Sequence, residues 1–89
     1  MPAHHLPIDG TLDLHTFAPR DVPLVVAEYL EAAHEVGLRE VRVVHGRGIG
    51  VQRAIVHRVL REHQLVADFW DAPDAHLGAT IVRLTAARS

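Results

Sequence analysis

The pattern of apolar and polar residues changes its period along the chain, and each change marks a structural element. Residues 12–15 alternate with the two-residue period of a half-buried strand, and residues 41–45 are rich in β-branched residues, which favours a second strand. Residues 21–36 and 51–63 repeat apolar positions every three to four residues, which predicts two amphipathic helices. The remaining two strands are predicted at residues 66–70 and 79–84. The predicted order is strand, helix, strand, helix, strand, strand.

Local signals mark both ends of the first helix. Asp21 suits the N-cap position, and Pro23 is tolerated in the first turn because an N–H there has no partner within the helix. Gly37 stands where a left-handed residue ends many helices. The predicted apolar face consists of Leu24, Val25, Ala27, Tyr29, Leu30, Ala33 and Val36.

The second helix carries two distinct faces. Its predicted core stripe consists of Val51, Ile55 and Val59, with Val56 and Leu60 beside it. On another face, Arg53, His57 and Arg61 follow one another at four-residue intervals. This cationic stripe suits contact with a nucleic-acid backbone, and a solvated helix face is the alternative interpretation.

The connections predict an α+β fold, a two-layer βαβαββ sandwich in which a mixed four-stranded sheet has both helices on one face. Strands joined through a helix run parallel, and right-handed crossovers in one direction place both helices on the same side. In the first strand this arrangement buries Leu12 and Leu14 beneath the helices and leaves Asp13 and His15 on the other face.

Composition and length exclude several classes of protein. A chain of 89 residues forms one domain, predicted here at residues 12–85 with an arm at 1–11 and a tail at 86–89. The absence of cysteine excludes a disulfide framework, a zinc ribbon, a thiol nucleophile and an iron–sulfur cluster. No apolar run reaches the roughly 18 residues of a membrane span, and the N-terminus lacks signal-peptide features. We therefore expect a cytoplasmic protein with no membrane partner.

The net charge of −2 conceals an uneven distribution. Residues 39–61 hold six arginines and one acid, Glu40, which gives +5, so the rest of the chain carries −7. A basic segment of this kind is typical of contact with a phosphate-bearing partner.

Three segments that carry chemistry are predicted to meet at one edge of the sheet. Ligands of open α/β sheets bind beyond the carboxyl ends of parallel strands. Asp13 and His15 end the first strand there, and residues 45–50 leave the second. The last strand begins at the same edge with residues 78–80, because it runs antiparallel to its hairpin partner. Gly78 and Thr80 are therefore also expected to contact a nucleic acid there.

Glycines alternate in the segment that leaves the second strand. Gly46, Gly48 and Gly50 permit positive φ and precede the positive end of a helix, so free amides there would hold a phosphate. The spacing matches neither a Walker A loop nor a dinucleotide fingerprint, so the pattern does not predict a nucleotide cofactor. A tight strand-to-helix turn is the alternative. Arg47, within the loop, is placed to stabilise phosphoryl charge.

Histidine and aspartate in this region suit proton transfer. Asp13 and His15 share a strand face, and an imidazole oriented by a carboxylate exchanges protons at neutral pH. The alternative for Asp13 is an ion pair with Arg42 or Arg83. His45 would complete a metal set with Asp13 and His15, although a hydrogen-bonded supporting role is favoured. The other histidines are predicted on the arm (His4, His5) or at the surface (His34, His57, His63, His76).

Taken in order, Leu12-Asp13-Leu14-His15, His45-Gly46-Arg47-Gly48 and Gly78-Ala79-Thr80 closely resemble the small MutS-related (Smr) domain family over about residues 8–85. The resemblance implies a sheet with the fourth strand between the second and third, similar to the C-terminal domain of translation initiation factor three. It also implies a stand-alone short form of a nucleic-acid nicking or cleaving domain. Thr16 and Ala75-His76-Leu77 depart from the glycines of many members.

By this resemblance, Asp13 and His15 are the expected catalytic positions, and His45 to Gly48 form the loop for binding and cleavage. The expected function is an endonuclease acting on RNA or structured DNA, with RNA slightly favoured because no convincing metal set is present. No cofactor is expected, and a divalent metal is needed only if the substrate is DNA. The alternatives are a non-catalytic module that binds nucleic acid or the ribosome, and an interaction domain associated with DNA repair.

Overall fold

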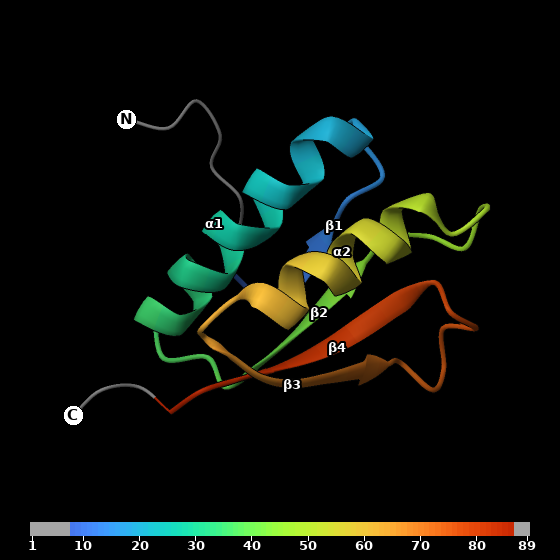
Figure 1. Ribbon diagram of the computed structural model, residues 1–89. Helices are drawn as coiled ribbons and strands as arrows, with labels where there is room; N and C mark the ends of the chain where they lie inside the picture. The colour runs from blue at the N-terminus through green and yellow to red at the C-terminus, as the bar shows by residue number, and fades with distance from the viewer. Residues whose placement is uncertain (1–7, 87–89) are drawn as a thin grey trace.

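The predicted order of elements is found in the computed structural model, which describes residues 8–86 (Figure 1). The elements are β1 (Thr11–Asp13), a 3-10 turn (Pro19–Asp21), α1 (Val22–Glu35), β2 (Glu40–Val44), α2 (Val51–Glu62), β3 (Val66–Asp71) and β4 (Ala79–Leu84). His4, His5 and most of the predicted arm and tail lie outside the described residues. Ile8 already packs against the core, so the folded part begins before the first strand.

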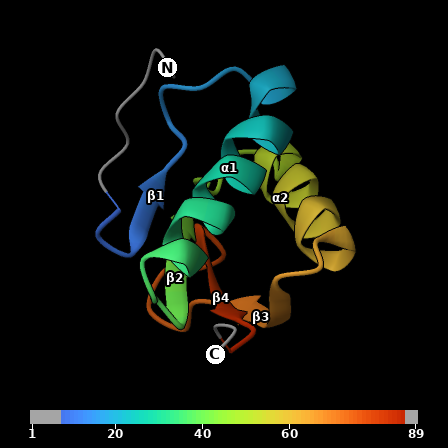
Figure 2. The same cartoon turned by 90° about the vertical axis from the view of Figure 1, so that its left-hand side faces the viewer.

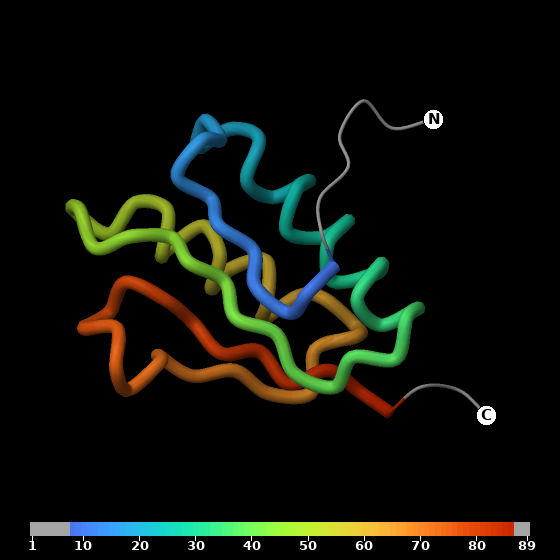
Figure 3. The backbone as a smooth tube through the Cα atoms, turned by 180° about the vertical axis from the view of Figure 1, so that it is seen from behind, coloured from blue at the N-terminus to red at the C-terminus, as the bar shows by residue number. Residues whose placement is uncertain are grey.

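The sheet has the order β1-β2-β4-β3, which places the last strand between the second and third. β1 and β2 are parallel, and β4 runs antiparallel to both of its neighbours. Both helices cover one face of this sheet (Figure 2), and the view from behind shows the strands in front of the helices (Figure 3). The predicted mixed sheet and two-layer architecture are confirmed.

The core lies between the sheet and the helices. Leu12 and Leu14 are buried there, as the alternation along β1 predicts, whereas Asp13 and His15 are exposed. On α1 the buried face is formed by Val22, Val26, Tyr29, Leu30 and Ala33. Leu24 and Val36, which were expected on the apolar face, are instead exposed. The broad apolar pattern of α1 left its exact rotation open, and packing against the sheet decides it.

Helix α2 is rotated relative to its predicted orientation. Val56 and Leu60 are its buried residues, and Ile55 and Val59 of the predicted stripe are half-buried against the core. Val51, expected in the same stripe, is exposed. This rotation turns Arg53 and His57 toward the end of β3, so they do not form a solvated stripe with Arg61.

Surface placement was also wrong for two further histidines. His34 and His63 are partly buried. The Nε2 atom of His63 lies 3.8 Å from a carboxylate oxygen of Glu31. Only His76 of the four is exposed.

Candidate phosphate-binding site

Backbone hydrogen bonds bring the three predicted segments together at one edge of the sheet. The N–H groups of His45 and Gly46 both donate to the Gly78 carbonyl, at 3.1 and 2.9 Å. On the other side, the Leu14 N–H donates to the Val44 carbonyl at 2.9 Å, which extends the pairing of β1 with β2. The predicted meeting of these segments is confirmed, and β2 lies between the other two because of the strand order.

The loop between β2 and α2, called here the glycine loop (residues 45–50), needs its glycines for backbone conformation. Gly46, Gly48 and Gly50 have φ of +80°, +35° and +84°, values that side chains rarely permit. Not all of its amides are free, which corrects the expectation above. Gly46 donates to Gly78, and the Gly50 N–H donates to the Arg47 carbonyl at 3.2 Å.

Three consecutive amides of the glycine loop remain available. The N–H groups of Arg47, Gly48 and Ile49 make no hydrogen bond to any residue that the structure describes. They immediately precede α2, whose N-terminus carries a partial positive charge. The loop therefore combines a tight turn with a set of free donors suited to an anion.

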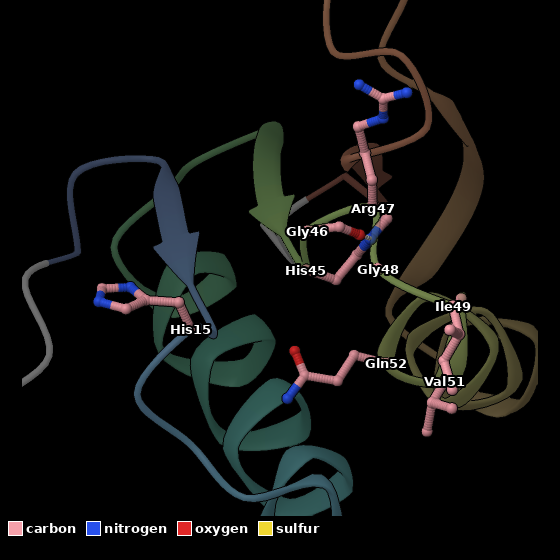
Figure 4. Close-up of a pocket in the computed structure, with 9 residues that line it drawn as sticks. His15, His45, Gly46, Arg47, Gly48, Ile49, Val51 and Gln52 are labelled. Atoms are coloured by element: carbon pink, nitrogen blue, oxygen red, sulfur yellow. Dashed lines mark hydrogen bonds between the residues drawn. The ribbon is translucent and has the colours of Figure 1, made fainter.

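A depression of about 340 Å³ lies beside these donors and is lined by His15, Gln52 and the glycine loop. The Gln52 amide donates to the Phe17 carbonyl at 3.1 Å, which ties α2 to the segment after β1. Figure 4 shows the imidazole of His15 turned away from the glycine loop, and Arg47 extending on the far side of the loop. His15 thus borders the depression without pointing into it.

Asp13 and His15 form a hydrogen-bonded pair. One oxygen, Asp13 Oδ1, accepts from both the backbone N–H and the Nδ1–H of His15, each at 2.9 Å. The backbone bond and then the ring bond from His15 lower the pKa of Asp13, which keeps it ionised at neutral pH. Because Nδ1 carries the proton, the Nε2 lone pair of a neutral His15 is left to accept one. The pair that was considered with Arg42 or Arg83 does not form; those arginines contact Asp74 and Asp68.

Beneath the glycine loop, His45 and His57 share one hydroxyl. Thr80 Oγ1 lies 2.8 Å from His45 Nε2 and 2.9 Å from His57 Nε2, and His45 Nδ1 lies 3.0 Å from the Gly46 carbonyl oxygen. His45 is therefore hydrogen-bonded through both ring nitrogens, in accord with its favoured supporting role. Thr80 is fully buried, so it cannot contact nucleic acid as the sequence analysis had it.

Asp71 is a residue that the sequence analysis missed. Its carboxylate receives two hydrogen bonds from Arg53, at 3.0 and 2.7 Å, so Arg53 is not a free phosphate contact. Asp71 follows Phe69 by two positions, so both side chains lie on the helix face of β3. The two-residue period of a strand was the sequence signal that could have placed Asp71 there. Its contact with Arg53 depends on the rotation of α2.

The basic segment is partly neutralised in the folded chain. Arg42 pairs with Asp74, Arg53 with Asp71, and Arg58 lies near Glu62. Arg39, Arg47 and Arg61 are exposed and form no ion pair with a described residue, and Arg39 precedes β2 at the opposite end of that strand from the glycine loop. Of the other two, Arg47 lies on the glycine loop and is the cation better placed for a phosphate held there, whereas Arg61 lies in the last turn of α2.

Burial of His45 and His57 predicts that acid destabilises the domain. Desolvation, with a smaller effect of Arg53, lowers the pKa of His57 from 6.5; desolvation also lowers the pKa of His45. The unfolded chain therefore takes up protons first, so the free energy of unfolding is fully present above about pH 6.5 and decreases below it. We expect urea unfolding to show lower stability at about pH 5.5 than at pH 7.5, and His57→Gln to reduce that difference. An unchanged difference in His57→Gln would contradict the assignment to His57. The carboxyls of Asp13 and Asp71 do not account for the difference, because their pKa values are lowered from 3.8 and they titrate well below pH 5.5.

No group of three or more histidine, aspartate or glutamate side chains within residues 8–86 is arranged to hold a metal ion. Across the same residues, no helix is both long enough and apolar enough to span a membrane.

Comparison with known proteins connects this geometry to a family. The model of the Smr domain matches residues 12–85, nearly the whole of the described chain. The chain belongs to the Smr domain family. Endonuclease MutS2 of Caldicellulosiruptor saccharolyticus is 37% identical over 79 residues, which cover 86% of this chain and 10% of that protein. The chain thus spans about a tenth of the length of the MutS2 relatives it matches.

Two solved Smr structures share the fold. The Smr domain of Thermus thermophilus MutS2 has a TM-score of 0.80 and 34% identity, covering 84% of this chain and 96% of that one. YdaL of Escherichia coli, a stand-alone small MutS-related protein, has a TM-score of 0.79 and 28% identity, covering 88% of this chain and 66% of that one.

One departure from the Smr pattern has a structural correlate. His76 and Leu77 stand where the resemblance leads us to expect glycine, and they adopt φ of +48° and +70°. Left-handed conformations cost a residue with a side chain about 1–2 kcal/mol. Glycine would relieve this strain, which explains why the position suits it.

Proposed function

We propose that this Smr domain is an endonuclease that cleaves RNA or structured DNA by acid–base chemistry at the glycine-loop edge of the sheet. The observation that carries the proposal is the Asp13–His15 pair, whose carboxylate holds the proton on Nδ1 and leaves Nε2 as a base. Of this pair, His15 borders the same depression as the free amides of the glycine loop. MutS2 relatives carry the name endonuclease, which agrees with this function.

In the proposed reaction, the N–H groups of Arg47, Gly48 and Ile49 hold the phosphate, and His15 removes a proton. The side chains of His15 and Asp13 are 76% and 53% exposed, and exposed side chains change rotamer within nanoseconds. In the proposed reaction the two side chains turn together toward a phosphate on the loop, so that Asp13 still holds the Nδ1 proton. Arg47 extends to the far side of the loop, where it would contact a neighbouring phosphate. His45 supports the loop from below and does not exchange protons with the substrate.

RNA is the proposed preferred substrate because its 2′-hydroxyl supplies the nucleophile. His15 Nε2 takes the hydroxyl proton, the 2′-oxygen bonds to phosphorus, and the bond from phosphorus to the 5′-oxygen breaks. The leaving oxygen takes a proton from water, which gives a 2′,3′-cyclic phosphate and a 5′-hydroxyl end. DNA lacks this nucleophile, and cutting it requires an activated water, generally with a divalent ion.

One assay with several substrates tests the proposal. Labelled RNA and supercoiled, branched and linear DNA are incubated with the domain, with and without a chelator, and the end groups are identified. Cleavage of RNA in chelator with cyclic phosphate ends supports the reaction above. Cleavage that occurs only with a divalent ion assigns the domain to metal-assisted hydrolysis. No cleavage of any substrate overturns the endonuclease proposal.

A second candidate is a binding module without catalysis, and the outward direction of the His15 ring favours it. In that role the free amides and Arg47 would hold a nucleic acid, for example on the ribosome or at a site of DNA repair. Such a module would bind the substrates of the assay above without cutting them.

Replacement of Arg47 tests the nucleic-acid contact in both candidates. We expect Arg47→Ala to weaken binding and to reduce the slope of log Kd against log salt concentration by about 0.7–0.9, the value for one lost phosphate contact. Arg58→Ala is the matched control, since Arg58 is exposed and lies near Glu62. Affinity measured over a range of salt concentrations decides the matter. An equal slope for Arg47→Ala and wild type would remove Arg47 from the interface.

A further inference from the structure

The hydrogen bonds beneath the glycine loop have only one consistent direction. The Gly46 carbonyl can only accept, so His45 Nδ1 carries a proton and donates across 3.0 Å. The Nε2 of neutral His45 then accepts from the Thr80 hydroxyl at 2.8 Å. The Thr80 oxygen is left to accept at 2.9 Å from His57 Nε2–H. One chain of donors therefore runs from His57 through Thr80 and His45 to Gly46.

His57 is held in place from several sides. Its side chain is 15% exposed, and its ring packs edge-on against Phe69 at a centroid distance of 5.0 Å. Asp71 Oδ1 lies 3.8 Å from the same Nε2 that faces Thr80, which favours a proton on that nitrogen. Asp71 is itself fixed by two hydrogen bonds from Arg53. The donor end of the chain thus has both a set orientation and a set tautomer.

The acceptor end of the chain fixes the direction of one free amide of the glycine loop. The Gly46 carbonyl and the Arg47 N–H belong to one planar trans peptide, so they point in opposite directions. The bond from His45 that fixes the carbonyl therefore also fixes the direction of the Arg47 N–H. That N–H is the first of the free donors of the glycine loop.

We propose that His57 is a positioning residue, which acts through Thr80 and His45 to orient the Arg47 N–H toward the phosphate of the substrate. This inference rests on the proposed function for the identity of the anion, but the positioning itself is a property of the free domain. His57 does not touch the substrate, and its effect reaches the glycine loop only through hydrogen bonds.

Two substitutions at His57 separate its donor from its bulk. In His57→Gln the side-chain amide places an N–H donor at a similar reach, whereas His57→Leu fills similar space without a donor. At Thr80, Ser keeps the hydroxyl and Val removes it. We expect phosphate-ended oligonucleotide to bind His57→Leu and Thr80→Val about 3- to 10-fold more weakly, the effect of one lost hydrogen bond, and His57→Gln and Thr80→Ser close to wild type.

Nuclear magnetic resonance of the free domain distinguishes positioning from a purely structural role, because a structural role alone would leave the Arg47 amide signal unchanged. Ring nitrogen shifts of wild type should show His57 protonated on Nε2 and His45 on Nδ1. The Arg47 amide signal should shift in His57→Leu and Thr80→Val and stay in place in His57→Gln and Thr80→Ser. Thermal unfolding shows whether each variant folds. If His57→Leu does not fold, the comparison of Thr80→Val with Thr80→Ser tests the proposal.

Two results would overturn the proposal. One is a neutral His57 that carries its proton on Nδ1. The other is an Arg47 amide signal that stays in place in both His57→Leu and Thr80→Val. These measurements need no cleavage. A domain that cuts no substrate but shows the expected signals refutes the endonuclease proposal and leaves the positioning role intact. A domain that cuts but lacks these signals refutes the positioning role and leaves the endonuclease proposal intact.

Discussion

His15→Ala is expected to lower the rate of cleavage by about 100- to 10,000-fold, the usual contribution of a general acid or base. Affinity for nucleic acid should remain within about twofold, since the free amides of the glycine loop do not depend on this side chain. Single-turnover cleavage and equilibrium binding, measured on the same substrate, separate the two effects. Because the His15 ring is exposed, the variant should keep the stability of wild type.

Two companions sharpen this prediction. Asp13→Asn keeps an oxygen for the backbone N–H of His15 but removes the charge that holds the ring proton, so it should slow cleavage less than His15→Ala. His63→Gln is the matched histidine control, because His63 lies just beyond the C-terminal end of α2, away from the glycine loop. Cleavage that survives in His15→Ala would show that His15 is not the base and would favour the binding module.

Gly78→Ala is expected to lower the free energy of unfolding by about 1–3 kcal/mol, as overpacking does, and to impair cleavage as well. A Cβ there would lie 2.9 Å from the Ala75 carbonyl oxygen and 3.3 Å from Arg47 Cγ. The backbone must shift, and the Gly78 carbonyl, which receives the N–H groups of His45 and Gly46, shifts with it. Denaturant unfolding and the cleavage assay measure the two effects.

Gly37→Ala provides the matched control for Gly78→Ala. Gly37 has φ of +91° and open space around its Cβ position, so alanine there costs about 1–2 kcal/mol of backbone strain without a clash. It ends α1, away from the glycine loop, so cleavage by the folded variant should stay at the wild-type rate. If both variants lose activity in proportion to stability, Gly78 has no particular role in placing the loop.

Several features of this domain follow from local sequence. The alternation of Leu12 to His15 predicts which side chains of that segment are buried, because successive residues of a strand point to opposite faces. The alternating glycines predict the positive φ of the loop before α2, since only glycine adopts it without strain. The meeting of Asp13, the loop and Gly78 follows from the connectivity alone.

Other features depend on the rotation of α2 about its axis. The sequence offers Val51, Ile55 and Val59 as a core stripe as readily as it offers Val56 and Leu60, because the apolar positions cover a wide arc. Packing buries Val56 and Leu60 fully and leaves Ile55 and Val59 half-buried against the core. This rotation turns Arg53 and His57 from solvent toward the sheet.

What the sequence determined by itself was the order of the elements, the parity of β1 and the conformation of the glycine loop, all of which are set by neighbours along the chain. What only the tertiary structure decided was the partner of each polar side chain. Asp71 meets Arg53, and Thr80 joins His45 to His57, across separations of 18 to 35 residues. Such contacts depend on how a helix rotates and on which way a ring turns, and these are fixed by packing that no local pattern records.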